Sequence, residues 1–88
     1  MTAYNAVIVE IYPDDTDTDL ERVLKDLKES LPDDIEIKDH KIEPLAFGIN
    51  KLIIAFLVPE KEEKIRQLEE ILNSIEGASA EIKSISRI

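Results

Sequence analysis

The 88-residue sequence contains no cysteine and no tryptophan, and it has only two glycines and four prolines. Without cysteine the chain cannot form disulfides, and it offers neither a thiolate metal ligand nor a cysteine nucleophile. The two glycines, Gly48 and Gly77, lie too far apart for a glycine-rich phosphate-binding loop. These absences remove several classes of enzyme and metalloprotein.

Long apolar runs and basic stretches are also missing. No run approaches the roughly 20 apolar residues of a membrane-spanning helix, and the sequence opens without a signal-peptide pattern. The 11 basic residues are dispersed among 20 acidic ones, for a net charge of −9, whereas nucleic-acid binding depends on Lys and Arg contacts with phosphates. We therefore expect a cytoplasmic protein that binds neither nucleic acid nor membranes directly and whose partner is another protein.

The sequence does contain alternating strand and helix patterns. Runs rich in β-branched residues predict strands at 4–12 and 49–58, and weaker alternation predicts strands near 35–42 and 80–88. Apolar residues at helical spacing predict two helices, the first carrying Leu20, Val23, Leu24, Leu27 and Leu31 and the second Ile65, Leu68, Ile71, Leu72 and Ile75. The order β-α-β-β-α-β predicts one α+β domain over residues 1–88: a ferredoxin-like sandwich with a four-stranded antiparallel sheet and both helices on one face.

Turn and cap residues predict several boundaries. Thr18 followed three residues later by Glu21 is typical of a capping box at the start of the first helix. Gly77 is typical of the end of the second helix. The alternation of the second strand changes phase between Lys38 and Lys41, which predicts a bulge or an early end in a strand at the edge of the sheet.

Candidate catalytic and metal-binding residues are few. His40 is the only histidine, and because charged residues surround it in the sequence we interpret it as an exposed side chain. Asp15, Asp17 and Asp19 have the spacing of a calcium loop, but Leu20 stands where that loop requires glycine. We interpret these aspartates as helix-capping acids, and we expect no metal, no cofactor and no bond-breaking chemistry.

The segment from Glu43 to Phe56 has the sequence EPLAFGINKLIIAF. Its second half is typical of a buried strand, and its first half is an unusual turn before that strand. Between Pro44 and Gly48 lie three apolar residues, where a solvent-exposed turn normally carries polar ones. Phe47 either folds back onto the edge of the sheet or projects as a hydrophobic anchor for a partner, because interface hot spots favour aromatic residues. Composition slightly favours the first arrangement and leaves both open.

The stretch PLAFGINKL, residues 44–52, resembles the signature of the translation elongation factor one beta family. The PDDTD stretch after the first strand and the basic-apolar ending Arg87-Ile88 are also similar, so the resemblance covers essentially the whole chain. At this length the chain is similar to the free-standing archaeal form of the family. The resemblance implies a ferredoxin-like fold and guanine-nucleotide exchange on the GTPase elongation factor one alpha, in translation elongation.

The resemblance also implies roles for single residues. Phe47 is expected to enter an apolar pocket of the GTPase. Arg87, which stands where the eukaryotic pattern has lysine, is expected to approach the Mg²⁺ and phosphate site of the GTPase. The expected partner-binding residues are Pro44, Phe47, Gly48, Ile49, Lys51, Arg87 and Ile88.

A second interpretation stays open on the residues alone. The chain is then a non-catalytic ferredoxin-like interaction module, natural or designed, that uses its open sheet face or an edge strand to bind a partner or a second copy. The sequence PEKEEKIR, residues 59–66, reads as an idealised helix start where the family commonly has a loop with Gly and Thr. The two interpretations differ in whether Phe47 is exposed and Arg87 lies ordered near it.

Overall fold

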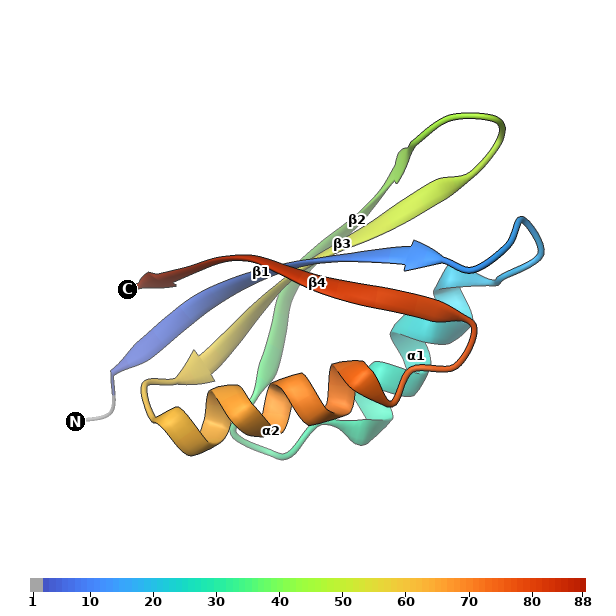
Figure 1. Cartoon of the computed structure of the whole chain (residues 1–88). Helices are drawn as coiled ribbons and strands as arrows, with labels where there is room; N and C mark the ends of the chain where they lie inside the picture. Colours follow the sequence, from blue (N-terminus) through green and yellow to red (C-terminus); the bar gives the residue numbers. More distant parts are fainter. Residues whose placement is uncertain (1–2) are drawn as a thin grey trace.

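The computed structural model of the chain describes residues 3–88 (Figure 1). Within them the elements follow the order β-α-β-β-α-β. The strands are β1 (Tyr4–Pro13), β2 (Glu36–Pro44), β3 (Asn50–Pro59) and β4 (Ala78–Arg87), and the helices are α1 (Leu20–Ser30) and α2 (Glu62–Asn73). The predicted order and types of these elements are confirmed.

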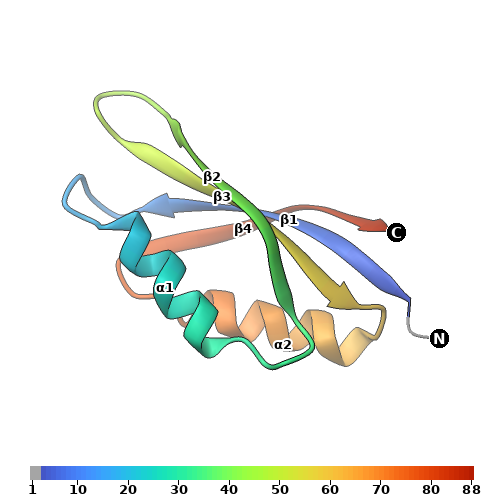
Figure 2. The same ribbon diagram turned by 180° about the vertical axis from the view of Figure 1, so that it is seen from behind.

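The strands form one sheet in the order β2-β3-β1-β4, and each neighbouring pair is antiparallel. Both helices lie on the same face of the twisted sheet, as Figure 1 and the reverse view in Figure 2 show. The fold is therefore the predicted ferredoxin-like sandwich. In both views the β2–β3 hairpin extends beyond the helices at one end of the sheet, and the C-terminus lies at the other end.

The two central strands, β1 and β3, supply much of the core. Successive side chains of a strand point to opposite faces, so alternate residues of each strand face the helices. The helix-facing residues that are at most 1% exposed are Val7, Val9 and Ile11 of β1 and Leu52, Ile54, Phe56 and Val58 of β3. Both helices cover them with buried apolar side chains, chiefly Val23, Leu27 and Leu68. Removal of these apolar side chains from water is the main term that favours folding.

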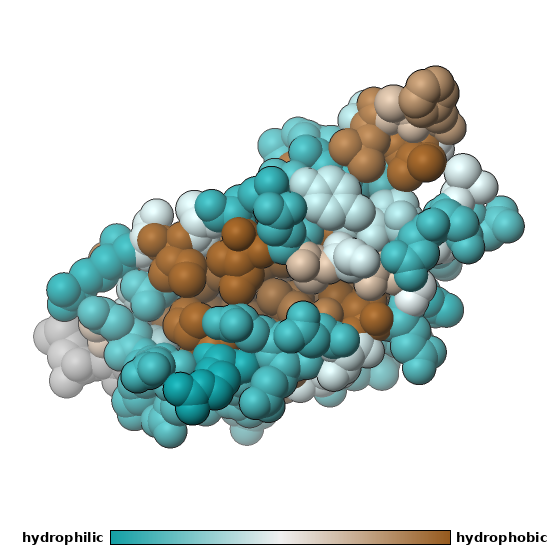
Figure 3. Space-filling model, viewed as in Figure 1, coloured by the Kyte–Doolittle hydropathy of each residue, from teal (hydrophilic) through white to brown (hydrophobic). Residues whose placement is uncertain are grey.

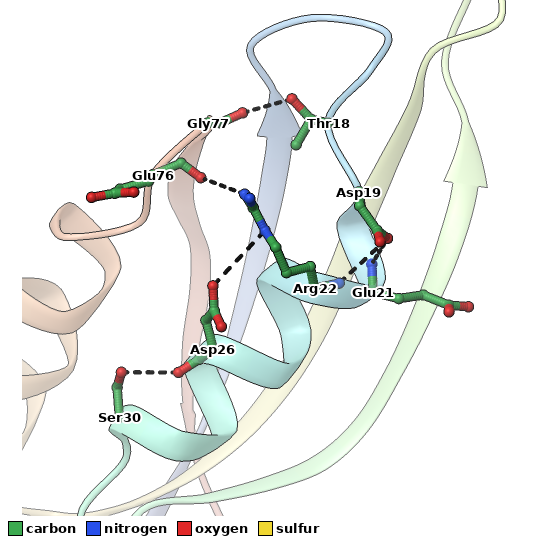
Figure 4. Close-up of polar contacts among 8 residues, drawn as sticks. All are labelled: Thr18, Asp19, Glu21, Arg22, Asp26, Ser30, Glu76 and Gly77. Atoms are coloured by element: carbon green, nitrogen blue, oxygen red, sulfur yellow. Dashed lines mark hydrogen bonds and ion pairs between the residues drawn. The ribbon is translucent and has the colours of Figure 1, made fainter.

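The start of α1 differs from the prediction in its capping residue (Figure 4). Asp19 is the N-cap, because its Oδ1 atom accepts hydrogen bonds from the backbone N–H of Glu21 at 3.0 Å and of Arg22 at 3.4 Å. The Thr18 hydroxyl instead donates to the carbonyl oxygen of Gly77 at 3.0 Å. The predicted capping box at Thr18 is therefore wrong: a distant loop engages that hydroxyl, and the neighbouring aspartate binds the free helix amides.

The end of α2 also differs from the prediction. The helix ends at Asn73, with Ser74 as its C-cap. Gly77 lies farther along, in the turn into β4, where its φ is +82° and its carbonyl oxygen accepts a hydrogen bond from the Asp14 backbone N–H at 2.9 Å. The left-handed conformation that glycine permits thus serves the turn into β4 and does not close the helix.

Each edge strand contains a bulge. In β2 the register with β3 shifts between Ile37 and Asp39, which leaves Lys38 as the extra residue. The predicted edge position of this strand is confirmed, and its irregularity lies at the start of the predicted interval. A bulge with a charged side chain makes an edge strand a poor template for another strand.

The bulge in β4 explains why this strand shows no clean alternation in the sequence. Ile82 pairs with Val9 and Ile85 pairs with Val7, so Lys83 lies in the register shift between them. Ile82 and Ile85 are three residues apart, which in a regular strand places them on opposite faces. The bulge brings both to the helix-covered face.

The two phenylalanines of the chain provide a matched test of this core. Phe56 is 1% exposed, whereas Phe47 is 98% exposed. Phe56→Ala is expected to lower the free energy of unfolding by about 3–5 kcal/mol, and Phe47→Ala to change it by less than about 0.5 kcal/mol. Urea unfolding followed by circular dichroism measures both values. Equal losses in the two variants would contradict the assignment of Phe56 to the core.

Candidate functional site

The loop between β2 and β3, residues 45–49, is a tight turn that we call the hairpin tip. The Ile49 backbone N–H donates to the carbonyl oxygen of Ala46 at 3.0 Å. Between these residues, Phe47 has a φ of +56° and Gly48 a φ of +77°. Two consecutive positive φ values in a four-residue turn are typical of a type I′ turn, whose twist matches the twist of the strands that it joins.

Phe47 projects away from the rest of the protein. It is 98% exposed, the largest value among the large apolar side chains of residues 3–88. Of the two arrangements that composition left open, projection is the one observed. Figure 3 shows apolar surface gathered over the end of the hairpin, to which the partly exposed side chains of Leu45 and Ile42 also contribute.

Leu45 and Ile42 are absent from the predicted contact residues. For Leu45 the lack of polar residues between Pro44 and Gly48 is a signal that could have identified it. Ile42 pairs with the buried Leu52 of β3, yet its own side chain is 44% exposed. Its exposure depends on how far the helices extend along the hairpin, which no local pattern in the sequence reveals.

The backbone conformation of Phe47 makes its exposure informative. A residue other than glycine, asparagine or aspartate is uncommon at positive φ, and a bulky one is an outlier. The left-handed conformation destabilises an L-residue by about 1–2 kcal/mol. A side chain that is 98% exposed makes little packing within the fold that could offset this. The combination makes Phe47 a candidate for a contact outside the fold.

Lys51 belongs to a polar cluster on the open sheet face, the face opposite the helices. Its Nζ atom lies 3.0 Å from Oε1 of Glu10, and the Tyr12 hydroxyl donates to the same oxygen. The Tyr12 hydroxyl and then the Lys51 ammonium group lower the pKa of the Glu10 carboxyl group. The hydrogen bond with Glu10 raises the pKa of Lys51. Of the predicted contact residues near the hairpin tip, Lys51 is therefore engaged within the protein.

Arg87 and Ile88 lie at the carboxy-terminal end of β4. The Arg87 guanidinium Nε lies 3.1 Å from Oε2 of Glu60, which precedes α2. The Ile88 backbone N–H donates to the Tyr4 carbonyl oxygen at 3.1 Å. Both side chains are largely exposed, 73% for Arg87 and 68% for Ile88. Glu60 as the partner of Arg87 has no signal in the sequence, because the two residues meet only through the fold.

The structure does not bring Arg87 close to Phe47. Arg87 pairs with Asn5, and Asn5 pairs with Val58 of β3, whereas Asn50 at the start of β3 adjoins the hairpin tip. Val58 and Asn50 are eight residues apart in one strand, which corresponds to about 26 Å. The predicted contact residues thus form two groups at opposite ends of the sheet. The expectation that Arg87 lies near Phe47 is wrong, whereas the exposure of Phe47 is observed.

The aspartates before α1 participate in the local structure of their loop. Oδ1 of Asp15 accepts a hydrogen bond from the Asp17 backbone N–H at 2.8 Å and lies 3.4 Å from the Thr18 hydroxyl oxygen, and Asp19 caps the helix. The His40 side chain is exposed, as expected. Residues 3–88 contain no group of three or more His, Cys, Asp or Glu side chains arranged to hold a metal ion.

A sandwich with an exposed aromatic turn has the features of a protein-binding domain, and the comparisons with known proteins identify its class. Residues 6–88 match the family described as the EF-1 guanine nucleotide exchange domain. A protein named elongation factor 1-beta from Metallosphaera sedula is 38% identical over 84 residues, which are 93% of this chain and 92% of that protein. Proteins of the same name from Ignicoccus hospitalis and Saccharolobus solfataricus are each 36% identical over 84 residues, which are 93% of this chain and 89% and 92% of theirs.

The chain therefore belongs to the EF-1 guanine nucleotide exchange domain family, and the resemblance seen in the sequence is confirmed. Its role is guanine-nucleotide exchange in translation elongation, which makes it a regulator of a GTPase. The relatives named above are archaeal elongation factors. Neither helix within residues 3–88 combines the length and apolar character needed to cross a membrane.

The polar cluster on the open face yields a prediction about pH. The pKa of Glu10 in the folded protein lies below its ordinary value of 4.5. A carboxyl group whose pKa is lowered by folding stabilises the protein fully above the unfolded value, and this stabilisation is lost as the pH falls through the folded pKa. Tyr12→Phe is expected to raise the pKa of Glu10, because it removes the strongest of the contacts that lower it.

A carboxyl-carbon NMR titration of Glu10 measures this pKa directly. Lys83→Met is the matched control, because Lys83 makes the weakest of the contributions that lower the pKa of Glu10 and its removal is expected to raise that pKa less. A Glu10 pKa unchanged by Tyr12→Phe would show that the hydrogen bond does not form in solution.

Proposed function

We propose that this protein binds elongation factor 1-alpha and accelerates the release of its GDP. We place this activity in the cytoplasm, where translation elongation occurs, and assign the protein no bond chemistry of its own. The family match and the named relatives support the exchange activity. The proposed mode of binding rests on one observation: the Phe47 side chain is 98% exposed and its backbone has a φ of +56°.

Exchange by such a protein is a consequence of linked equilibria. GDP leaves a GTPase slowly because its phosphates and Mg²⁺ hold the switch loops in place. A protein that binds the nucleotide-free GTPase more tightly than the GDP-bound form must weaken the binding of GDP by the same factor. The exchange factor therefore needs a surface that fits the nucleotide-free form, and no catalytic group that makes or breaks a bond.

Phe47 is the apolar contact in this proposal. Burial of one aromatic side chain in a pocket can supply the contribution of about 2 kcal/mol or more that is typical of an interface hot spot. Pro44 restricts the backbone before Phe47, and the type I′ turn that Gly48 permits holds the backbone of Phe47 itself. Less conformational entropy is therefore lost when this segment is immobilised against a partner. Ile49 follows in the same turn. These four residues form the contact group at the hairpin tip.

Arg87 is the charged contact at the opposite end. It is the last residue of β4, and its side chain is 73% exposed, so it can reach an anionic surface of the partner. Ile88 adds an exposed apolar side chain beside it. Because the two groups lie at opposite ends of a molecule 45 Å long, we propose that the GTPase contacts both ends. Lys51, which pairs with Glu10, then contributes at the margin of the hairpin group.

Self-association through a sheet edge is the weaker candidate. The extra residue in the bulge of β2 is Lys38, and in the bulge of β4 it is Lys83. Bulges and lysines on edge strands oppose pairing with another strand. The structure therefore favours use of the hairpin tip over use of the edges.

The first test is the release of a fluorescent GDP analogue from archaeal elongation factor 1-alpha. The protein is expected to accelerate release at micromolar concentration, and Phe47→Ala is expected to lower the second-order rate constant about tenfold or more, because an interface hot spot is lost. Lys28→Ala, in the exposed last turn of α1, is the control and should leave the rate unchanged. The absence of acceleration by the unmodified protein would end the proposal, and full activity of Phe47→Ala would remove Phe47 as the contact.

The second test separates the charge of Arg87 from its shape. If the positive charge is what matters, Arg87→Ala slows exchange about fivefold or more, whereas Arg87→Lys retains most of the rate. Lys83→Ala, which removes another cation of the same strand, is the control. Equal activity of Arg87→Ala and the unmodified protein would show that the carboxy-terminal end does not take part.

A further inference from the structure

We infer that Gly48 is a positioning residue for Phe47, and that the chain loses folding stability at position 47 in order to present an aromatic side chain there. The part that concerns Gly48 rests on the proposed exchange function. The part that concerns stability does not, because it follows from the turn itself.

The need for glycine at position 48 comes from the backbone and not from a lack of space. A Cβ atom added to Gly48 would meet nothing within 4 Å. At Gly77, in contrast, a Cβ atom would lie 3.5 Å from the Arg22 guanidinium group and 3.8 Å from Thr18. Gly48 has a φ of +77°, a conformation that side chains of L-residues rarely adopt. Any substitution at Gly48 therefore acts through the conformation of the turn.

The residue at position 47 is the wrong type for this turn. The first central position of a type I′ turn favours asparagine, aspartate or glycine, which tolerate positive φ. Phenylalanine has no side-chain group that can form the local hydrogen bond of asparagine. At 98% exposure, Phe47 also gains little from burial within the protein. A chain that needed only to connect β2 with β3 would be more stable with asparagine at this position.

The turn type decides where the aromatic ring points. Type I and type II turns have negative φ at the first central position, so a change to either type moves the side chain of residue 47 and splays the two strands. If only a fraction of molecules holds the type I′ turn, the affinity for a partner that needs this orientation falls by the same fraction. Gly48 thus affects exchange without itself filling the pocket of the partner.

The stability arm of the test compares Phe47→Asn with Phe47→Ala. Both variants remove the ring, but only asparagine relieves the backbone strain. The Tm of Phe47→Asn is expected to exceed that of Phe47→Ala by about 4–8 °C, the shift that corresponds to the strain of one left-handed residue in a domain of this size. Phe47→Ala should unfold close to the unmodified protein. A Tm of Phe47→Asn no higher than that of Phe47→Ala would overturn the claim that position 47 is strained.

The exchange arm compares Gly48→Ala with Gly48→Asn, measured well below the Tm of both variants. Gly48→Ala is expected to lower the rate of GDP release about 5- to 30-fold, because the left-handed turn becomes a minor conformer. Gly48→Asn tolerates positive φ and should restore the rate to within about twofold of the unmodified protein. Two other results would overturn the positioning role: full activity of Gly48→Ala, or equal loss in both variants.

The Tm comparison at position 47 and the exchange comparison at position 48 can give negative results independently of each other. If the unmodified protein does not accelerate GDP release, the proposed exchange function is wrong and the positioning role of Gly48 falls with it. The Tm comparison at position 47 still decides whether the turn is strained. If the unmodified protein is active and Gly48→Ala matches it, only the positioning role is overturned.

Discussion

The antiparallel pairing of β1 with β3 is the contact on which the other elements depend, because it aligns the alternating apolar side chains that both helices cover. Its register runs from Tyr4 opposite Pro59 to Ile11 opposite Leu52. It places fully buried side chains such as Val9 and Ile54 side by side on one face. A register shifted by one residue would turn the apolar side chains of one strand away from the helices, so this pairing is strongly specified.

The same register determines where the functional groups lie. β3 begins beside the hairpin tip and ends beside the first residues of β1, which pair with the carboxy-terminal end of β4. Phe47 and Arg87 thus lie at opposite ends of the sheet. The two phenylalanines have different environments, since Phe56 is buried in the core and Phe47 is exposed at the hairpin tip. One stabilises the fold, and we propose that the other is reserved for the partner.

Local patterns in the sequence were sufficient for the architecture. The apolar runs of β1 and β3 and the helical spacing of Leu20 to Leu27 predict the elements, because burial on one face imposes those periods. The details that could not be predicted depend on residues far apart in the chain. The hydroxyl of Thr18 is engaged by Gly77, 59 residues away, and the capping role passes to Asp19.

The candidate site likewise combines features that local sequence suggests with features that depend on residues far apart in the chain. The apolar residues of PLAFG are unusual for a solvent-exposed turn, but by themselves they left two arrangements of Phe47 open. The resemblance to the family is what predicted a role for Phe47 in binding. Its orientation depends on a backbone conformation that the sequence suggested only through Gly48. The separation of Arg87 from Phe47 depends on the strand order β2-β3-β1-β4. The ion pair of Arg87 with Glu60 likewise arises only in the assembled sheet.

In the proposed function, exchange depends on a preference of this protein for the nucleotide-free GTPase. Titration calorimetry of this protein with elongation factor 1-alpha, with and without saturating GDP, measures that preference. We expect tighter binding to the nucleotide-free form, by the same factor by which saturating amounts of this protein weaken GDP binding. Equal affinity for the two forms would contradict it, because a protein that does not distinguish the two states cannot shift the equilibrium between them.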